Sequence, residues 1–352
     1  MLECKILTTE KELESLEQAW HALYERATTR PFSDYSTVSL WWKGFPYRKQ
    51  SMLHIVAGWH DGRLVALLPL IVYRKGGVRA LLWAGYNAFL GDLQLLENPK
   101  DLEELWRAAY QSPHYDVAEI RYVEPETPLQ KIVSSFPCSK ILEDTIITSL
   151  CFNGMDSAAW IATLRRKLRV EVRRKKRVIE REGKFSFDVY QDHVPDALID
   201  QMIAEKKEWC KVRDFKDAAF DFVPDLAKDA AAHGRLIFFA LSCGGKPIGL
   251  SLGFTLNKTV FAYMISYDSA WSKCSPGIVT SVEAISWAAD NGFVEFNFME
   301  GKEKYKLKYM NREQPVFTYV FCRTFVGWVA HFVLLFRRNN RFTTLIKRLL
   351  RK

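Results

Sequence analysis

The sequence lacks the features that mark a secreted, disulfide-bonded or metal-binding protein. Its seven cysteines are odd in number and lie far apart, and no CxxC pair occurs, which argues against a disulfide framework or a zinc site. Its seven histidines show no HExxH or HxxxH spacing. The N-terminus opens with acidic and polar residues rather than the basic start and apolar core of a secretory signal. These absences predict a cytoplasmic protein that carries no metal.

The charge is distributed unevenly along the chain. The formal net charge is +9. The segment Arg165–Lys184 has a net charge of +8, and Arg323–Lys352, which contains no acid, also has +8, so the rest of the chain is net −7. An acidic body with two basic patches predicts an anionic partner, such as a nucleotide, RNA or phosphate head groups. The alternative for the first patch is a solvated basic helix face.

The length of 352 residues and the hydrophobic content of 48% predict two domains, which we assign to residues 1–150 and 151–322, followed by a basic amphipathic tail over 323–352. In the first domain, the apolar periodicity of Glu10–Arg26 predicts a helix. Residues 52–73 contain two β-rich runs around an Asp-Gly turn, which indicates a hairpin. The first domain is therefore expected to be mixed α/β.

The second domain is expected to begin with an amphipathic, strongly basic helix over Ser157–Glu182. Asp156 is suited to cap its start, and Gly183 lies just beyond its end. Two apolar runs within residues 236–256 flank a Gly-Gly turn and indicate a second hairpin. A third strand is predicted over Val260–Tyr267.

A strand, a polar loop and a helix that follow one another then suggest an anion site. Ser275 is suited to the N-cap and Pro276 to the first position of a helix over Ile278–Asn291, which is followed by a strand over Val294–Met299. A helix start directly after a strand presents free N–H groups, which bind pyrophosphate. Gly277 allows a ligand to approach the backbone closely.

The motifs of this region resemble those of a known family. They are, in order, a hairpin, a strand, the tripeptide SPG, a helix, the tripeptide NGF, a strand, and then Gly301, Glu303, Tyr305 and Lys306. This order resembles the CelD-like acyltransferases of the GNAT superfamily, which are relatives of the FemAB aminoacyltransferases. The resemblance covers roughly residues 155–320 and extends weakly over the N-terminal half. It implies an α/β (α+β) fold of tandem GNAT-like lobes, each a mixed, mostly antiparallel sheet flanked by helices, with a degenerate first lobe.

The resemblance also implies a donor and its binding residues. Acyl-coenzyme A is the expected co-substrate, bound by Ser275, Gly277, Ile278 and Lys306. Asn297 stands where the family usually has an acidic residue, and the phosphate-binding loop is shorter than in typical coenzyme A users. Aminoacyl-tRNA therefore stays open as the donor, because FemAB-type members use it.

Acyl transfer needs a base for the acceptor, stabilisation of the oxyanion and an acid for the leaving thiolate. Glu300 and Glu303 are candidate bases, and Tyr305 is the candidate acid. The alternatives are solvated turn carboxylates, an amphipathic core tyrosine and, for Lys306, a surface lysine. Asp268 either orients the acceptor or forms a turn.

The tail combines an apolar run with arginines and lysines. Phe325–Phe336 is apolar for about twelve residues, which is too short to span a bilayer. Aromatic residues flanked by arginines are typical of an interfacial helix on anionic lipid, and the alternative is a helix packed on the body. Residues 323–352 are thus expected to reach the inner face of the membrane, where the acceptor is lipid-linked.

The function favoured by these observations is acyl transfer from acyl-coenzyme A to an amine or hydroxyl of a sugar, glycan or lipid-linked acceptor. A role in cell-envelope or exopolysaccharide biosynthesis is implied by the resemblance alone. Two alternatives stay open: FemAB-type aminoacyl transfer from tRNA, and a non-catalytic RNA- or membrane-binding protein on a GNAT fold. The acceptor, the acyl chain length and the oligomeric state are not specified by the sequence.

Overall fold

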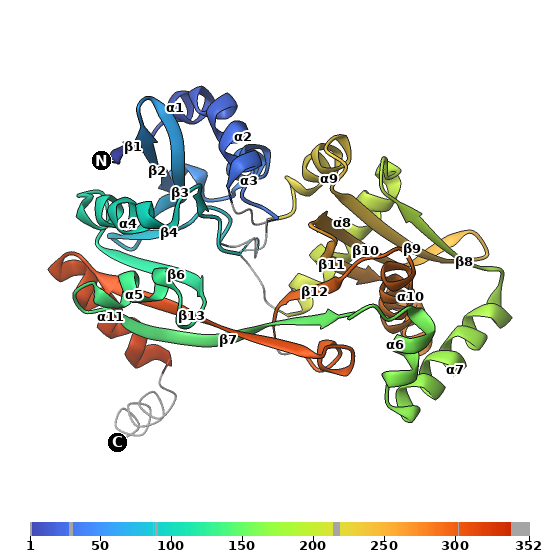
Figure 1. The fold of residues 1–352 in the computed structure, drawn as a ribbon. Coiled ribbons are helices and arrows are strands. Elements are labelled where there is room, and N and C mark those ends of the chain that lie inside the picture. Colours follow the sequence, from blue (N-terminus) through green and yellow to red (C-terminus); the bar gives the residue numbers. More distant parts are fainter. Residues whose placement is uncertain are drawn as a thin grey trace, which may run out of the picture. The chain divides into compact units, whose positions relative to one another are not determined.

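The computed structural model describes residues 2–27, 31–86, 88, 91–213, 219–301 and 303–338 (Figure 1). The last part of the predicted tail, residues 339–352, lies outside the described residues. The chain forms two compact units, one of Met1–Asp144 with Pro315–Lys352 and the other of Thr145–Gln314. Each unit is a mostly antiparallel sheet flanked by helices, which confirms the predicted mixed α/β fold class.

The first unit has its sheet in the order β1-β2-β3-β4-β6-β13, with β5 paired to β3. Neighbouring strands are antiparallel apart from β4 and β6, which run parallel. Its elements are β1 (Glu3–Leu7), α1 (Glu10–Ser15), α2 (Glu17–Arg26), α3 (Tyr35–Gly44), η1 (Arg48–Gln50), β2 (Ser51–His60), β3 (Arg63–Lys75), β4 (Val78–Trp83), β5 (Leu95–Leu96), η2 (Pro99–Asp101), α4 (Leu102–Gln111), β6 (Val117–Val123), α5 (Pro128–Ser135), β13 (Arg312–Cys322) and α11 (Phe325–Arg338).

The β2–β3 hairpin confirms the prediction made from the Asp-Gly turn. Asp61 and Gly62 both have positive φ, at 50° and 75°, as a tight two-residue hairpin turn requires. The single helix predicted over Glu10–Arg26 is wrong, because α1 and α2 are separate. The break falls at Leu16, whose N–H bonds to the carbonyl of Leu13 at 3.1 Å in a tightened turn, and both leucines are buried there.

The second unit has its sheet in the order β7-β12-β11-β10-β9-β8. β11 and β12 run parallel, and the other neighbours are antiparallel. Its elements are β7 (Lys140–Cys151, which begins in the first unit), α6 (Ser157–Thr163), α7 (Arg166–Glu182), β8 (Phe185–Tyr190), α8 (Asp196–Val212), α9 (Val223–Ala232), β9 (Leu236–Cys243), β10 (Lys246–Leu256), β11 (Thr259–Tyr267), η3 (Ser269–Cys274), α10 (Pro276–Asp290), β12 (Glu295–Glu300) and η4 (Lys306–Lys308).

The basic helix predicted over Ser157–Glu182 is also two helices, α6 and α7. Its start is as expected, because the Asp156 side chain accepts a hydrogen bond from the N–H of Ala159 at 2.7 Å. The chain becomes extended at Leu164 (ψ 146°) and Arg165 (ψ 135°), and the Leu164 side chain is buried. Helical propensity continues through this point, so tertiary packing sets the break.

Helix α10 is the central helix of the second unit and packs on β9, β10, β11, α6 and α7. Its inner face contributes Val282, Ile285 and Ala288 to the same buried cluster as Trp160 of α6. A glycine on β10 permits this close packing, because a Cβ at Gly249 would lie 2.3 Å from Oγ1 of Thr280. The start of α10 is therefore fixed against the sheet.

Candidate functional site

Strands β11 and β12 diverge beyond their first residues. Their parallel pairing joins Thr259–Phe261 to Glu295–Asn297. Farther on, each strand pairs with its outer neighbour, since Tyr267 aligns with Gly249 of β10 and Glu300 with Ile147 of β7. Parallel strands that separate in this way direct backbone N–H and C=O groups into the opening between them.

A pocket of about 970 Å³ lies at the end of β11. Four segments of the second unit line it: helix α8, the end of β11 with its following loop, the first turns of α10, and the segment before η4. The residues that line it include Lys206, Trp209, Arg213, Tyr267, Ser275, Gly277, Ile278, Ser281, Glu303 and Tyr305. The predicted donor-binding residues Ser275, Gly277 and Ile278 thus share one pocket with Glu303 and Tyr305.

Helix α10 begins at this pocket with Pro276 in its first turn, as predicted. Ser275 is not the expected side-chain N-cap: it adopts a left-handed conformation (φ 50°, ψ 55°) and makes no capping hydrogen bond. A left-handed residue turns the chain sharply from η3 into α10. Gly277 lies against Tyr267, and a Cβ there would be 3.3 Å from the ring.

Four predicted site residues, at the end of β12 and after it, divide into two pairs. Tyr305 is half-buried and Glu303 is exposed, and both line the pocket. Burial raises the pKa of Tyr305, and the nearby Glu303 carboxylate raises it further. Lys306 is buried; its ammonium donates to the carbonyl oxygen of Glu300 at 2.5 Å and pairs with Glu303 at 3.0 Å. Glu300 and Lys306 are not among the described residues that line the pocket.

The segment around Glu303 needs a glycine. Gly301 has φ 128°, and a Cβ there would lie 2.1 Å from a carboxylate oxygen of Glu303. Asn297 has a local structural role, because its side-chain oxygen accepts a hydrogen bond from the N–H of Met299, a residue with φ 61°. This hydrogen bond supports the irregular end of β12, where the pairing with β7 shifts register.

Sequence reasoning missed the contribution of helix α8. Lys206, Trp209 and Arg213 line the pocket, and both cations lie over the Trp209 ring, at 5.1 Å and 4.4 Å from its centroid. Burial lowers the pKa of Lys206. The spacing of three and then four residues puts these side chains on one helix face, and that pattern was the available signal.

The remaining candidate, Asp268, has a structural role. Asp268 accepts from the N–H of Ala270 at 2.9 Å at the start of η3 and pairs with Lys246 at 2.7 Å. The Lys246 ammonium lowers the pKa of Asp268. Asp268 is therefore the turn former that the alternative interpretation expected. Cys274 is buried in an apolar cluster with Val279 and Ile179.

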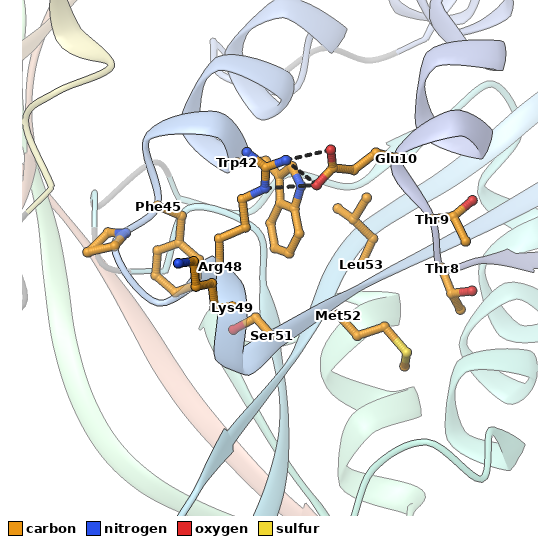
Figure 2. A pocket seen from close by; sticks show the side chains of 11 residues that line it. Thr8, Thr9, Glu10, Trp42, Phe45, Arg48, Lys49, Ser51, Met52 and Leu53 are labelled. Atoms are coloured by element: carbon orange, nitrogen blue, oxygen red, sulfur yellow. Dashed lines mark hydrogen bonds and ion pairs between the residues drawn. The ribbon is translucent and has the colours of Figure 1, made fainter.

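A second pocket, of about 860 Å³, lies in the first unit beside α3 and β2 (Figure 2). Figure 2 shows the Glu10 carboxylate joined to the Arg48 guanidinium and the Trp42 indole. The Arg48 hydrogen bond is 2.5 Å long and the Trp42 hydrogen bond 3.0 Å. The hydrogen bond from Arg48 lowers the pKa of Glu10. Because these charges neutralise each other, the pocket beside α10 offers more reactive chemistry.

Among the described residues, no group of three or more His, Cys, Asp or Glu side chains is arranged to hold a metal ion. Across the same ranges, every helix is too short or too polar to cross a bilayer.

Comparisons with known proteins agree with the geometry of this unit. Residues 166–307 match the family model described as an acetyltransferase (GNAT) domain. All the residues that line the α10 pocket lie within this matched segment. The predicted transferase class is thereby confirmed. Comparison with curated proteins gives no match.

Solved structures share the fold at low sequence identity. FemX superposes with a TM-score of 0.59 at 9% identity, over 95% of this chain and 100% of that one. The C-terminal domain of a protein described as a lysylphosphatidylglycerol synthetase from Agrobacterium fabrum gives 0.58 at 12%, over 91% and 95%. A tandem GNAT protein from the clavulanic acid biosynthesis pathway gives 0.50 at 13%, over 92% and 99%.

Proposed function

We propose that this protein transfers an acyl group from acyl-coenzyme A, held in the α8–β11–α10 pocket, to an amine or hydroxyl of a sugar, glycan or lipid-linked acceptor. The observation that carries the proposal is the convergence of several groups on one pocket. They are the start of α10, a cation of α8 and another just beyond its end, and Tyr305 beside Glu303. The CelD-like resemblance supports a cytoplasmic role in polysaccharide or envelope biosynthesis.

The residues of the pocket fit a donor with a phosphate-bearing end. The first turn of α10 offers N–H groups and the positive end of the helix dipole, and Lys206 and Arg213 add two cations. Gly277 leaves the backbone uncovered apart from the Tyr267 ring. The opening between β11 and β12 suits an extended chain of amides such as pantetheine, because both offer alternating donors and acceptors.

The residues near Tyr305 fit the proton transfers of the reaction. The acceptor nitrogen or oxygen attacks the thioester carbonyl carbon, a C–N or C–O bond forms, and the C–S bond breaks. Glu303 takes the proton that the acceptor loses. Tyr305, which burial keeps protonated, gives a proton to the leaving thiolate. Lys306 positions the Glu303 carboxylate and ties it to the end of β12.

Donor binding is testable without knowledge of the acceptor. A ligand at a hundred times its dissociation constant stabilises the folded protein by about 2.7 kcal/mol, so thermal melting is measured with acetyl-CoA, longer acyl-CoAs, free CoA and tRNA. We expect CoA compounds to raise the melting temperature of the parent. The double variant Lys206→Ala/Arg213→Ala should lose most of that rise.

The matched control is Lys207→Ala/Lys211→Ala, which removes two exposed lysines from the same helix outside the pocket lining. It should keep the parent's response. If no CoA compound stabilises the parent, or if both double variants respond equally, the proposed donor site is wrong.

Aminoacyl transfer from tRNA is the second candidate. It is favoured by the outer face of α7, where Arg166, Arg173, Arg174, Arg177 and Arg181 are exposed. No acidic partner for these arginines occurs within the described part of the chain. A rise in melting temperature with tRNA and none with CoA would support this candidate over the first.

A further inference from the structure

Helix α11 exposes a continuous apolar face. Phe325, Trp328 and Phe332 are 77%, 47% and 48% exposed, and Val326 and Val329 beside them are 49% and 41% exposed. The three rings stack along the helix, with centroids 6.1 Å and 5.8 Å apart. Isolated apolar residues on a surface need no explanation, but five within two turns of one helix form a patch that indicates a binding surface.

The opposite face of α11 is fixed to the first unit. Gly327 packs against the backbone of Asp116, the residue before β6. A Cβ on Gly327 would lie 1.9 Å from the carbonyl oxygen of Asp116. His331, one turn later, is buried. Thr324 donates to the Asp116 carboxylate at 3.0 Å and accepts from the N–H of Gly327 at 3.2 Å. The orientation of the helix is therefore set by the fold, and the aromatic face points outward because of it.

The charged residues in the sequence of this segment are all basic. Residues 323–352 contain eight Lys and Arg and no Asp or Glu, and Arg337 and Arg338 end the helix. Two copies of such a surface would repel each other, whereas an anionic surface would attract it. With fourteen residues, α11 is about 21 Å long, which is less than the roughly 30 Å of a bilayer's hydrocarbon core.

We propose that the outer face of α11 docks on an anionic lipid bilayer, with Phe325, Trp328 and Phe332 inserted at the level of the head groups and the net positive charge of the segment attracting it to the anionic surface. This inference is independent of the donor and acceptor proposed above. It assigns the first unit the task of holding the transferase at a membrane surface.

The test uses the full chain and vesicles of phosphatidylcholine with and without phosphatidylglycerol. Removal of residues after Arg323 is a poor test, because it deletes the buried side of α11 together with the exposed side. Substitutions on the outer face avoid this problem. We expect the parent to sediment with the vesicles that contain phosphatidylglycerol, and Trp328→Ser/Phe332→Ser to lower its partition coefficient at least tenfold, or about 1.4 kcal/mol.

The matched control is Ile141→Ser/Val294→Ser, which replaces two exposed apolar residues elsewhere and should bind as the parent does. Arg337→Gln/Arg338→Gln should weaken binding to the anionic vesicles and leave the weak binding to pure phosphatidylcholine unchanged. Equal sedimentation of the parent and Trp328→Ser/Phe332→Ser overturns the proposal. A parent dimer that this variant converts to monomer also overturns it, because a second copy then covers the face.

Discussion

Tyr305 and Glu303 line one pocket, but the protein withdraws them from water to different extents. Tyr305 is half-buried, and burial raises its pKa, whereas Glu303 is exposed and paired with the buried Lys306 ammonium. The tyrosine hydroxyl, kept protonated by burial, and a carboxyl group that pairs with an ammonium therefore face the same space. A reaction that removes one proton and supplies another requires two such groups side by side.

Tyr305→Phe should bind the donor as the parent does and turn over about 10²- to 10⁴-fold more slowly, which is the usual contribution of a general acid. Release of the free thiol measures turnover, and thermal melting measures donor binding.

Because the pKa of Tyr305 is raised, the group keeps its proton through the neutral range and loses it only above its ordinary value near 10. The parent's activity should therefore show no alkaline decline from this residue below about pH 10.

Tyr190→Phe removes a hydroxyl from β8, away from the pocket lining, and should leave turnover unchanged. Retention of full activity in Tyr305→Phe would exclude the tyrosine as the acid.

At the scale of elements, the packing of α10 on β10 fixes where the helix start lies. Thr280 of α10 is fully buried against Gly249, and its hydroxyl has no hydrogen-bond partner within the described residues. Gly249→Ala would push a methyl group into Oγ1 of Thr280 and displace the helix from the strand. The cost of such overpacking is about 1 to 3 kcal/mol in the free energy of unfolding.

Combining Gly249→Ala with Thr280→Ala should restore part of that stability, because the second change removes the atom that the new methyl would meet. Urea titrations of the parent, both single variants and the double variant give the coupling energy directly. Simple addition of the two single losses would show that the contact does not set the position of α10.

The sequence predicted the hairpins and the strand-loop-helix order because each depends on neighbouring residues. Asp61-Gly62 specifies a tight turn on its own, and Pro276 specifies a helix start. The breaks at Leu16 and Leu164 were missed, since helical periodicity runs through both and burial in the folded unit decides them. The predicted order of strand, loop, helix and strand also assigned Ser275, Gly277, Glu303 and Tyr305 to one site.

The contribution of α8 was not predictable in the same way. Lys206 lies about seventy residues before Gly277 in the chain, and only the sheet order β10–β11 with α8 beside it unites them. The left-handed Ser275 and the buried Lys306 likewise depend on packing rather than on residue type. The apolar and basic residues of the tail predicted an amphipathic helix. The direction in which its apolar face points depends on the packing of Gly327 on the backbone of Asp116.

At the scale of the whole molecule, basic residues are concentrated in segments where few acidic side chains pair with them. Helix α7 packs through Leu168, Val172 and Ile179, and its Lys176 pairs with Glu283 at 2.9 Å. Its remaining basic residues are mostly exposed. Over seventeen residues, or about 25 Å, the helix presents a row of guanidinium groups that matches a phosphate backbone better than a single small ligand.

This arrangement predicts salt-dependent binding of tRNA through α7. The variant Arg173→Gln/Arg174→Gln/Arg177→Gln should weaken tRNA binding and reduce the slope of log K against log salt by about 2 to 3, since each phosphate contact contributes roughly 0.7 in single strands and 0.9 in a duplex. Fluorescence anisotropy over a salt series measures both quantities.

The control Lys75→Gln/Lys100→Gln/Lys131→Gln removes the same charge from exposed positions of the first unit and should leave the slope unchanged. Equal slopes for the two triple variants would mean that tRNA responds to net charge alone and that α7 is a solvated face. A selective loss, together with stabilisation by tRNA and none by CoA, would instead make aminoacyl-tRNA the donor.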